Sequence, residues 1–117
     1  MNNASCLFCK IINKELPADV VYDNENVLAF HDIQPKAPIH ILIIPKEHIE
    51  SINSENSENA VGGLILAAKD IIKKDNLSGC KLLFNIGRDG GQIIDHLHMH
   101  LLCQLQYQNK EKNQLKI

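Results

Sequence analysis

The sequence predicts an α+β fold, in which an antiparallel sheet carries one main helix. Runs rich in β-branched and aromatic residues outnumber the helical patterns, and the connections between them are short. The segment from Val61 to Ile72 has apolar residues at i, i+3, i+4 and i+7, the spacing of an amphipathic helix that can pack on such a sheet. A chain of 117 residues fits a single domain over 1–117.

Composition and charge exclude several classes of function. The net charge is −2 and the pI is about 6.3, which argues against a broad surface for nucleic acid or anionic membranes. No apolar run approaches the ~20 residues of a membrane span, and the N-terminus lacks the pattern of a secretory signal. We therefore expect a cytoplasmic protein with reduced thiols. The unusual counts are six histidines and four cysteines, and they mark where chemistry is expected.

The first third of the chain is expected to form a helix, a hairpin and a loop. Residues 6–14 carry apolar side chains at a helical spacing, and Pro17 ends that pattern. The runs 19–22 and 26–31 are rich in β-forming residues and flank a polar turn, as in a β-hairpin. Two prolines make residues 34–38 a loop, because proline restricts the backbone and removes an amide donor.

The remaining elements are strands around the one long helix. The continuous apolar run at residues 40–44 predicts a strand that is covered on both faces. We expect a short helical turn within 46–52, and Ser54 or Ser57 as the cap of the amphipathic helix. Expected after that helix are a strand at 81–86, a glycine-rich loop, a strand at 94–102 and a polar tail at 103–117.

A strand with three alternate histidines is the strongest chemical signal in the chain. Side chains alternate between the faces of a strand, so His96, His98 and His100 point to one face and the intervening apolar residues point into the core. Three interpretations fit this row: a solvated polar face, a metal site, and a nucleophilic histidine assisted by its neighbours. A metal-bound imidazole has no free lone pair, so His98 cannot be both nucleophile and ligand.

The loop before this strand has the composition of a phosphate-binding turn. Gly87, Gly90 and Gly91 permit positive φ angles and let backbone N–H groups approach an anion. Asn85 and Gln92 bracket the loop with amide donors. A simple hairpin turn also needs glycine, so that interpretation stays open.

The four cysteines divide into a close pair and two isolated residues. Cys6 and Cys9 form a CxxC motif, which is half of a zinc site by its spacing. A redox pair and two buried thiols without metal are the alternatives, and the redox one is weaker because no βαβ pattern precedes the motif. Cys80 and Cys103 are expected to be ordinary packing or surface thiols, so no disulfide is expected.

Several segments of the sequence resemble the histidine-triad (HIT) family, and most closely its Hint branch of purine nucleoside phosphoramidases of the bacterial type with an N-terminal CxxC. They are Ala29–His40, Ile43–Ile49, Gly90–Gln92 and His96–Leu102. The resemblance covers about residues 6–102 and leaves the tail outside it. It implies a HIT-like fold with a five-stranded antiparallel sheet, one long helix and a short N-terminal helix, assembled as a homodimer.

The resemblance also implies a reaction and the residues that perform it. The reaction is hydrolysis of nucleoside 5′-monophosphate derivatives, such as adenosine phosphoramidate, through a nucleotidyl-histidine intermediate that needs no metal. His98 would be the nucleophile, His100 would bind the α-phosphate, and His40 would set the protonation of His98. Asp32 would accept both ribose hydroxyls. The other expected nucleotide-binding residues are Asn85, Gly91 and Gln92 near the phosphate, and Phe8, Ile11, Leu16, Phe30, His31 and Ile33 around a purine base.

By the same resemblance, His48 and His96 join Cys6 and Cys9 as ligands of a structural zinc ion. A closed set of two thiolates and two imidazoles suits a structural rather than a catalytic metal. Such a site would hold the N-terminal helix to the sheet. Among the apolar residues assigned to the base pocket, Phe8 and Phe30 have plain core packing as their alternative role.

Two residues depart from the family pattern. Ile93 stands where Hint proteins commonly carry a small hydroxyl residue that contacts the leaving group, and Asp95 replaces a usual aromatic residue. Because Ile93 offers no donor, a purine-nucleotide-binding regulatory module with little turnover is one alternative function. A diadenosine-polyphosphate hydrolase and a hydrolase with catalytic zinc on the histidine row are the others. His100 counts against the nucleotidyl transferase branch, which usually has glutamine there.

Overall fold

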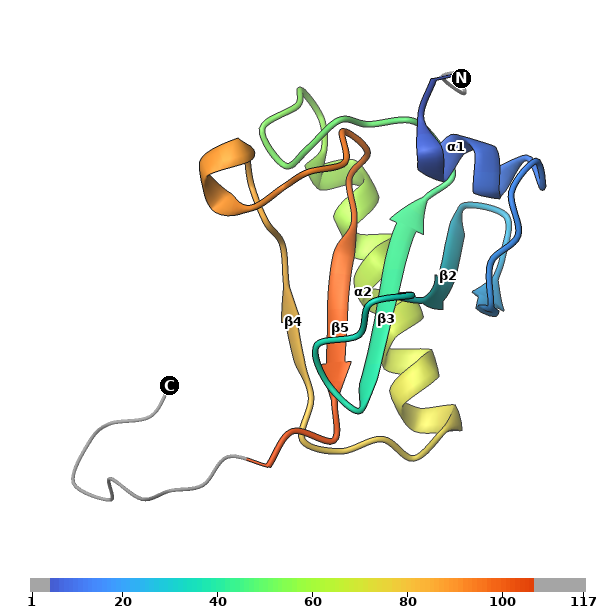
Figure 1. Cartoon of the computed structure of the whole chain (residues 1–117), viewed down its shortest axis with the longest axis vertical. Coiled ribbons are helices and arrows are strands. Elements are labelled where there is room, and N and C mark those ends of the chain that lie inside the picture. Colours follow the sequence, from blue (N-terminus) through green and yellow to red (C-terminus); the bar gives the residue numbers. More distant parts are fainter. Residues whose placement is uncertain (1–4, 107–117) are drawn as a thin grey trace.

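The computed structural model describes residues 5–106 and shows one five-stranded antiparallel sheet with a helix on each face (Figure 1). The strand order is β1-β2-β3-β5-β4. This confirms the α+β class and the expected five-stranded sheet with one long and one short helix. The elements are α1 (Leu7–Ile12), β1 (Val20–Asp23), β2 (Val27–His31), β3 (Ile39–Pro45), α2 (Glu58–Lys74), β4 (Lys81–Leu83), a 3₁₀ turn (Arg88–Gly90) and β5 (Met99–Cys103).

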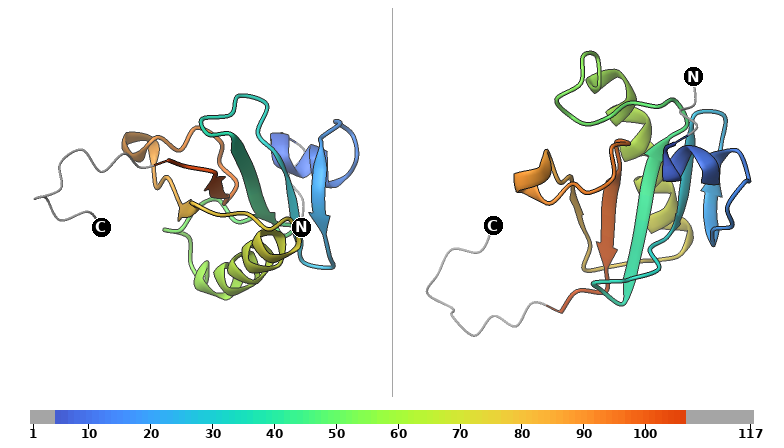
Figure 2. Two further views of the ribbon diagram at one scale, coloured as in Figure 1. Left: turned by 90° about the horizontal axis from the view of Figure 1, so that it is seen from below. Right: turned by 45° about the horizontal axis from the view of Figure 1, so that its top comes forward.

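The central strand β3 is covered on both faces, as its continuous apolar run predicts. Ile41 and Ile43 pack under α2, whereas Leu42 and Ile44 pack against α1 on the opposite face. The same alternation in β2 and β5 divides the buried side chains between two clusters. Figure 2 shows the long helix α2 on one side of the sheet and the short helix α1 on the other. The sheet therefore separates a large core under α2 from a smaller one under α1.

The ends of the two helices follow from local chemistry. The Cys6 thiol caps α1, because its Sγ accepts a hydrogen bond from the Cys9 N–H at 3.3 Å. Helix α2 is followed by Asn76 with a φ angle of 53°, a left-handed conformation that asparagine tolerates and that ends a helix. Ser57 precedes α2 but does not cap it with its side chain, because its hydroxyl donates to the Ile52 carbonyl at 2.6 Å.

Three sequence-based expectations of regular structure are wrong in detail. Residues 46–52 form no helical turn, and the strand expected over 81–86 ends at Leu83. The last strand begins at Met99 rather than at Ile94, because its ladder with β3 stops at the pair Ile43↔Met99. Before that point the chain turns to another partner, and the Leu97 N–H donates to the Ile49 carbonyl at 2.6 Å.

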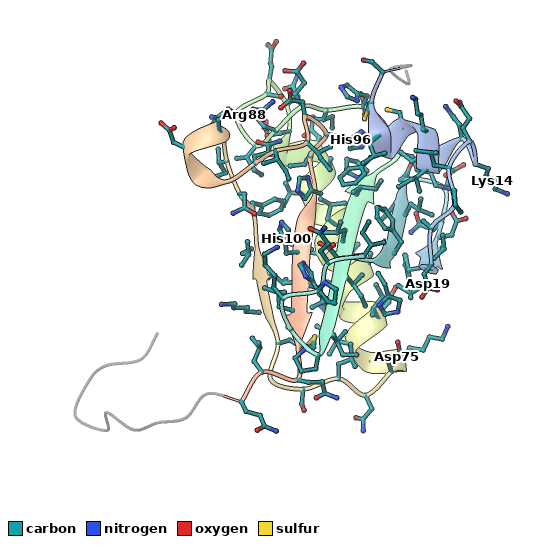
Figure 3. The ribbon with its side chains drawn as sticks, in the orientation of Figure 1. Lys14, Asp19, Asp75, Arg88, His96 and His100 are labelled. Atoms are coloured by element: carbon teal, nitrogen blue, oxygen red, sulfur yellow. A yellow bond between two sulfur atoms is a disulfide. The ribbon has the colours of Figure 1, made fainter. Side chains whose placement is uncertain are left out.

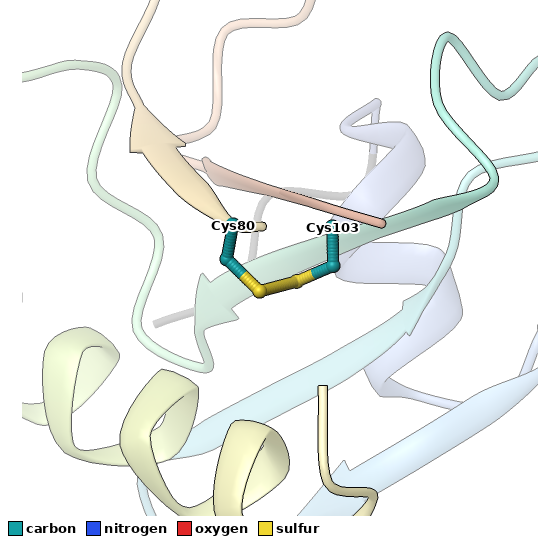
Figure 4. The surroundings of a disulfide bond; sticks show 2 residues. All are labelled: Cys80 and Cys103. Carbon is teal, nitrogen blue, oxygen red and sulfur yellow. A yellow bond between two sulfur atoms is a disulfide. The ribbon is translucent and has the colours of Figure 1, made fainter. Parts of the chain in front are cut away.

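The expectation of thiols at Cys80 and Cys103 is also wrong, since these residues form a disulfide (Figure 4). The register of the sheet explains it. Lys81 pairs with Leu102, so the residues one step further, Cys80 and Cys103, stand opposite each other with Cα atoms 4.0 Å apart. Cys103 is the last residue of β5 and not the first residue of the tail. Only residues 103–106 of the expected tail 103–117 fall within the described part of the chain.

Among residues 5–106, no helix is long and apolar enough to cross a membrane.

Candidate functional site

The histidine row lies on the α1 face of the sheet, opposite the core under α2. Leu97, which precedes β5, and Met99 and Leu101 of β5 pack in the large core, so the intervening histidines point to the other face as predicted. Figure 3 shows His100 near the middle of the sheet and His96 at the end closest to α1. His40 on β3 joins them from the neighbouring strand. We call His40, His98 and His100 the active-site histidines.

Hydrogen bonds fix the ring tautomers of two of these histidines. The backbone N–H of Lys36 donates to His40 Nδ1 at 3.0 Å, so Nδ1 is an acceptor and the ring proton of neutral His40 lies on Nε2. That Nε2–H faces His100 Nδ1 at 2.9 Å and Asp32 Oδ2 at 3.5 Å. His100 must then carry its own proton on Nε2. Within the described chain this buried Nε2 has no hydrogen-bond partner, so it is an unsatisfied donor.

His98 has the opposite tautomer. Its Nδ1–H donates to the His96 carbonyl at 2.7 Å, which leaves the lone pair on Nε2. No hydrogen bond to that Nε2 forms within residues 5–106. The ring of Phe8 meets the imidazole edge to face, with centroids 5.3 Å apart, and the His100 ring lies 5.1 Å away. His98 is thus a fixed ring that presents a free lone pair beside the unsatisfied donor of His100.

Burial keeps the active-site histidines neutral. It lowers the pKa of His98 and of His40, and it lowers the pKa of His100 to about 4. The nearby Asp32 carboxylate opposes this effect on all three residues, but desolvation is the larger cause. At neutral pH the lone pair of His98 is therefore available for attack on an electrophile.

The glycine-rich loop is held by two side-chain amides. Asn85 Nδ2 donates to the Gly90 carbonyl at 2.8 Å, and Gly91 sits beside this amide with a φ angle of 92°. Buried Gln92 accepts the Gly87 N–H at 3.1 Å, while its Nε2 donates to the carbonyls of Glu50 and Ile94. The sequence did not predict this bracing role. A phosphate contact of Asn85, Gly91 or Gln92 remains a prediction.

The apolar residues assigned to the base pocket separate into two groups. Phe8 and Phe30 are buried in the small core under α1, with half-buried Ile11 packed against them, which agrees with core packing as their role. Leu16 and Ile33 are exposed, Ile33 at 94% of its surface. His31 and Asp32, both half-buried, lie at and just after the end of β2. The base-binding role of this set remains a prediction.

The second group of histidines converges with the CxxC motif. Cys6, Cys9, His48 and His96 come from α1 and its cap, from the segment after β3, and from the segment before β5. Their Sγ and ring nitrogen atoms all lie within 4.8 Å of one another. His96 Nδ1 is 3.3 Å from Cys6 Sγ and 3.2 Å from His48 Nδ1. We call these four residues the thiol–imidazole cluster, and they form a possible metal-binding group.

The donor set of this cluster fits a tetrahedral metal ion. Two sulfur and two imidazole ligands are the chemistry that zinc prefers in structural sites. His96 Nε2 contacts the Pro45 carbonyl at 2.8 Å, so its proton lies there and its Nδ1 lone pair points into the cluster. Burial also lowers the pKa of His96 to about 4, which keeps the imidazole neutral and able to coordinate. The sequence spacing of the motif predicted half of this group, and the resemblance supplied the other half.

Comparison with known proteins places these features in one family. Residues 5–116 match the family model described as "Scavenger mRNA decapping enzyme C-term binding". The purine nucleoside phosphoramidase of Escherichia coli K12 is 45% identical over 100 residues, which cover 82% of this chain and 84% of that protein. Protein HitA of Neisseria gonorrhoeae is 42% identical over 101 residues, covering 84% of this chain and 94% of HitA.

Solved structures give the same result for the fold. A histidine triad protein from Clostridium difficile superposes with a TM-score of 0.88 at 37% identity, over 95% of this chain and 100% of that one. A HIT family hydrolase from Legionella pneumophila has a TM-score of 0.82 at 45% identity, over 87% and 95% of the two chains. The chain therefore belongs to the histidine-triad family, a family of nucleotide hydrolases.

Proposed function

We propose that this protein hydrolyses nucleoside 5′-monophosphate derivatives, and phosphoramidates in particular, through a covalent intermediate on His98. The observation that carries the proposal is the pairing of two complementary groups: the free lone pair of His98 Nε2 and the unsatisfied, buried N–H of His100 Nε2. A nucleophile beside a donor for a phosphoryl oxygen is what substitution at phosphorus requires. The similarity to a protein named purine nucleoside phosphoramidase supports the substrate class.

In the first step, His98 Nε2 attacks the α-phosphorus of the bound nucleotide derivative. A P–Nε2 bond forms while the bond from phosphorus to the leaving nitrogen breaks, and the departing amine takes up a proton. Ile93 is 80% exposed and has no donor, so in this proposal the proton comes from water. The His100 N–H donates to a non-bridging oxygen, where negative charge develops in the transition state.

In the second step, water attacks the same phosphorus and the P–Nε2 bond breaks. The products are a nucleoside 5′-monophosphate and the regenerated imidazole of His98. Because the Nδ1–H of His98 stays on the His96 carbonyl, the ring keeps its orientation in both steps. We assign Asp32 to the ribose hydroxyls, since a carboxylate can accept two hydrogen bonds from neighbouring hydroxyls.

We further propose that the thiol–imidazole cluster holds zinc. Cys6, Cys9, His48 and His96 would supply all four ligands, so a bound zinc ion would have no open position and would act structurally. It would fasten the start of α1 to the segments that flank β3 and β5. Since α1 also carries Phe8 against His98, the metal would act on the active site only through packing.

We also propose that the chain acts as a homodimer. Strand β4 forms an edge of the sheet, and its Leu82 is 41% exposed, so this edge can accept a second copy. Sedimentation velocity tests this proposal, and a monomer at micromolar concentration would contradict it. The cytoplasmic location expected from the sequence stays a prediction.

The experiment that tests the reaction is a comparison of the wild-type protein with His98→Ala. We expect wild-type protein to release AMP from adenosine phosphoramidate and the variant to lose at least about a thousandfold in kcat. Calorimetry with AMP should show that nucleotide binding survives the substitution. Equal turnover by both proteins would overturn the proposal, and so would wild-type turnover without a trapped nucleotidyl-protein adduct in rapidly quenched samples.

A second candidate function rests on Ile93. Its exposed, donor-free side chain gives no help to the leaving group, which favours a module that binds purine nucleotides with little turnover. The same two measurements separate the candidates. Micromolar binding of AMP by wild-type protein, with no product released from phosphoramidate or from a dinucleoside polyphosphate, would favour the binding module.

A further inference from the structure

The loop between β2 and β3 contributes a backbone hydrogen bond to His40, and the amide that donates it does not contact the substrate in the reaction proposed above. Lys36, a solvent-exposed residue between two prolines, points its backbone N–H at His40 Nδ1 over 3.0 Å. We propose that this amide is a positioning group that sets the ring tautomers of His40 and His100, and so creates the N–H donor for the substrate phosphate. The proposal deepens the proposed function and rests on it.

The direction of the hydrogen bonds carries the argument. A backbone N–H can only donate, so His40 Nδ1 must accept and the proton of the neutral ring must lie on Nε2. Both neighbours of that Nε2, His100 Nδ1 at 2.9 Å and Asp32 Oδ2 at 3.5 Å, can accept it. His100 is then protonated on Nε2. One amide therefore determines the state of a nitrogen two rings away.

Without this amide, a second arrangement becomes available. His40 could carry its proton on Nδ1, and its Nε2 would become an acceptor facing His100. His100 would then donate from Nδ1 and lose its Nε2–H. The unsatisfied donor would be replaced by a lone pair, which repels a phosphate oxygen instead of binding it.

The loop is built to hold the amide in place. The Asp32 N–H donates to the His40 carbonyl at 2.9 Å, which closes the base of the loop. The Gln34 N–H donates to Asp32 Oδ1 at 2.8 Å, so the carboxylate is fixed by the same turn. Pro35 and Pro38 restrict the backbone on both sides of Lys36. The Lys36 side chain is not needed for any of these contacts.

The Lys36 amide also disfavours metal binding by Asp32, His40 and His100. Asp32, His40 and His100 each offer a ligand atom, and these atoms lie within 4.8 Å of one another. A metal ion there would need the lone pair of His40 Nε2, but the Lys36 N–H keeps a proton on that atom. The loop therefore discriminates against zinc at the active site, although imidazole and carboxylate are good zinc ligands.

The test compares two variants. Lys36→Pro removes the amide proton of residue 36, whereas Lys36→Ala keeps that proton and removes only the side-chain charge. The ¹⁵N shifts of the imidazole nitrogens report the tautomer of His40 directly and do not depend on activity. We expect Lys36→Ala to keep the wild-type tautomer and Lys36→Pro to lose it. In the phosphoramidate assay, Lys36→Pro should lose about tenfold in kcat with little change in KM, the effect of one weakened hydrogen bond in the transition state. It should also become at least about tenfold more sensitive to inhibition by added zinc.

Proline at this position can disturb the loop, so a second variant replaces the amide of residue 36 by an ester through incorporation of the matching α-hydroxy acid. The ester keeps the side chain and the backbone path and removes only the N–H. An unchanged His40 tautomer in a folded ester variant would overturn the proposal. A changed tautomer in a protein that turns over no phosphoramidate would instead contradict the proposed function and leave the role of the amide standing.

Discussion

The active-site histidines and the thiol–imidazole cluster both use imidazole rings, but the rings of His98 and His96 are in opposite tautomers. His96 and His98 are two residues apart and both are buried, yet His96 keeps its proton on Nε2 and His98 keeps its proton on Nδ1. The difference comes from two carbonyls. Pro45 accepts from His96 and frees its Nδ1 for the cluster, whereas the His96 carbonyl accepts from His98 and frees its Nε2. The backbone, not the residue type, decides which histidine can be a ligand and which a nucleophile.

The two groups also differ in how their atoms are arranged. In the thiol–imidazole cluster two sulfur and two imidazole nitrogen atoms lie within 4.8 Å of one another, and this ligand set suits an ion. Among the active-site histidines the contacts run in series, from the Lys36 amide through His40 to His100, and the series ends at an unsatisfied N–H. Helix α1 links the two groups, because Phe8 contacts both His96 and His98.

The largest effect is expected from removing one ligand of the thiol–imidazole cluster. His48→Ala should lower the stability of the metal-loaded protein by about 4 kcal/mol, since a metal present at a thousand times its Kd contributes that much. This corresponds to a fall in Tm of more than about 10 °C in a chain of this size. Differential scanning calorimetry and metal analysis of the purified protein measure both quantities.

The matched control is His31→Ala, because His31 is also half-buried but lies outside the thiol–imidazole cluster. It should keep the metal content of the wild type and change Tm by only a few degrees. If the two variants behave alike, the cluster holds no metal.

A smaller loss of stability is expected from removing the Cys80–Cys103 disulfide, which involves no histidine. The Cys80–Cys103 disulfide closes a loop with a sequence separation of 23, and neither cysteine belongs to the thiol–imidazole cluster. Replacing both cysteines by alanine should lower the free energy of unfolding by about 2–4 kcal/mol in urea titrations. Metal content should stay at the wild-type value, and any loss of metal would show that the two cysteine pairs are coupled.

Much of this arrangement could be predicted from the sequence. The unbroken apolar run of β3 predicted burial on both faces, and the alternation of histidines with Leu97 and Met99 predicted which side faces the core. Periodicity succeeds here because every second residue of a buried strand must face the same layer. The separation of the histidines into two groups came from the resemblance, and the structure brings together both expected sets.

What the sequence could not predict depends on contacts distant in the chain. The strand of the histidine row was expected from Ile94, but its ladder with β3 begins at the pair Ile43↔Met99, because the preceding Leu97 N–H donates to the Ile49 carbonyl instead of to β3. The disulfide follows from the β4–β5 register, which fixes Cys80 opposite Cys103. The role of Lys36 had no signal at all, since a backbone N–H is the same in every residue except proline.

A third prediction tests the link between the two groups. Phe8→Leu should weaken the edge-to-face contacts with His96 and His98 and cost about 1 kcal/mol of stability. The kcat for phosphoramidate should fall a few-fold, because His98 loses part of the packing that fixes its ring. The control is Phe84→Leu, which alters the core on the α2 side. If both variants have the wild-type kcat, the packing of α1 does not position His98.

The smallest expected effect concerns the pH dependence of stability. Burial lowers the pKa of His100 to about 4, and the groups that face it are His98 just before β5, His40 on β3, and Asp32 and Lys36 on the loop before β3. The unfolded chain, with an ordinary histidine pKa near 6.5, therefore binds more protons than the folded chain between about pH 6.5 and pH 4. The stability associated with neutral His100 is complete above pH 6.5 and is lost as the pH falls through this window.

His100→Gln removes the titrating group, so the unfolding free energy of the variant should fall less than that of wild type between pH 7 and pH 5. The difference between the two slopes should be on the order of 1 kcal/mol, because the site is only partly shielded from solvent. Urea unfolding of both proteins at the two pH values measures it, and the titrating groups that do not face His100 cancel in the comparison. Parallel curves would mean that His100 is as easily protonated in the folded protein as in water, and the unsatisfied N–H that distinguishes the active-site histidines from the thiol–imidazole cluster would then belong to a charged ring.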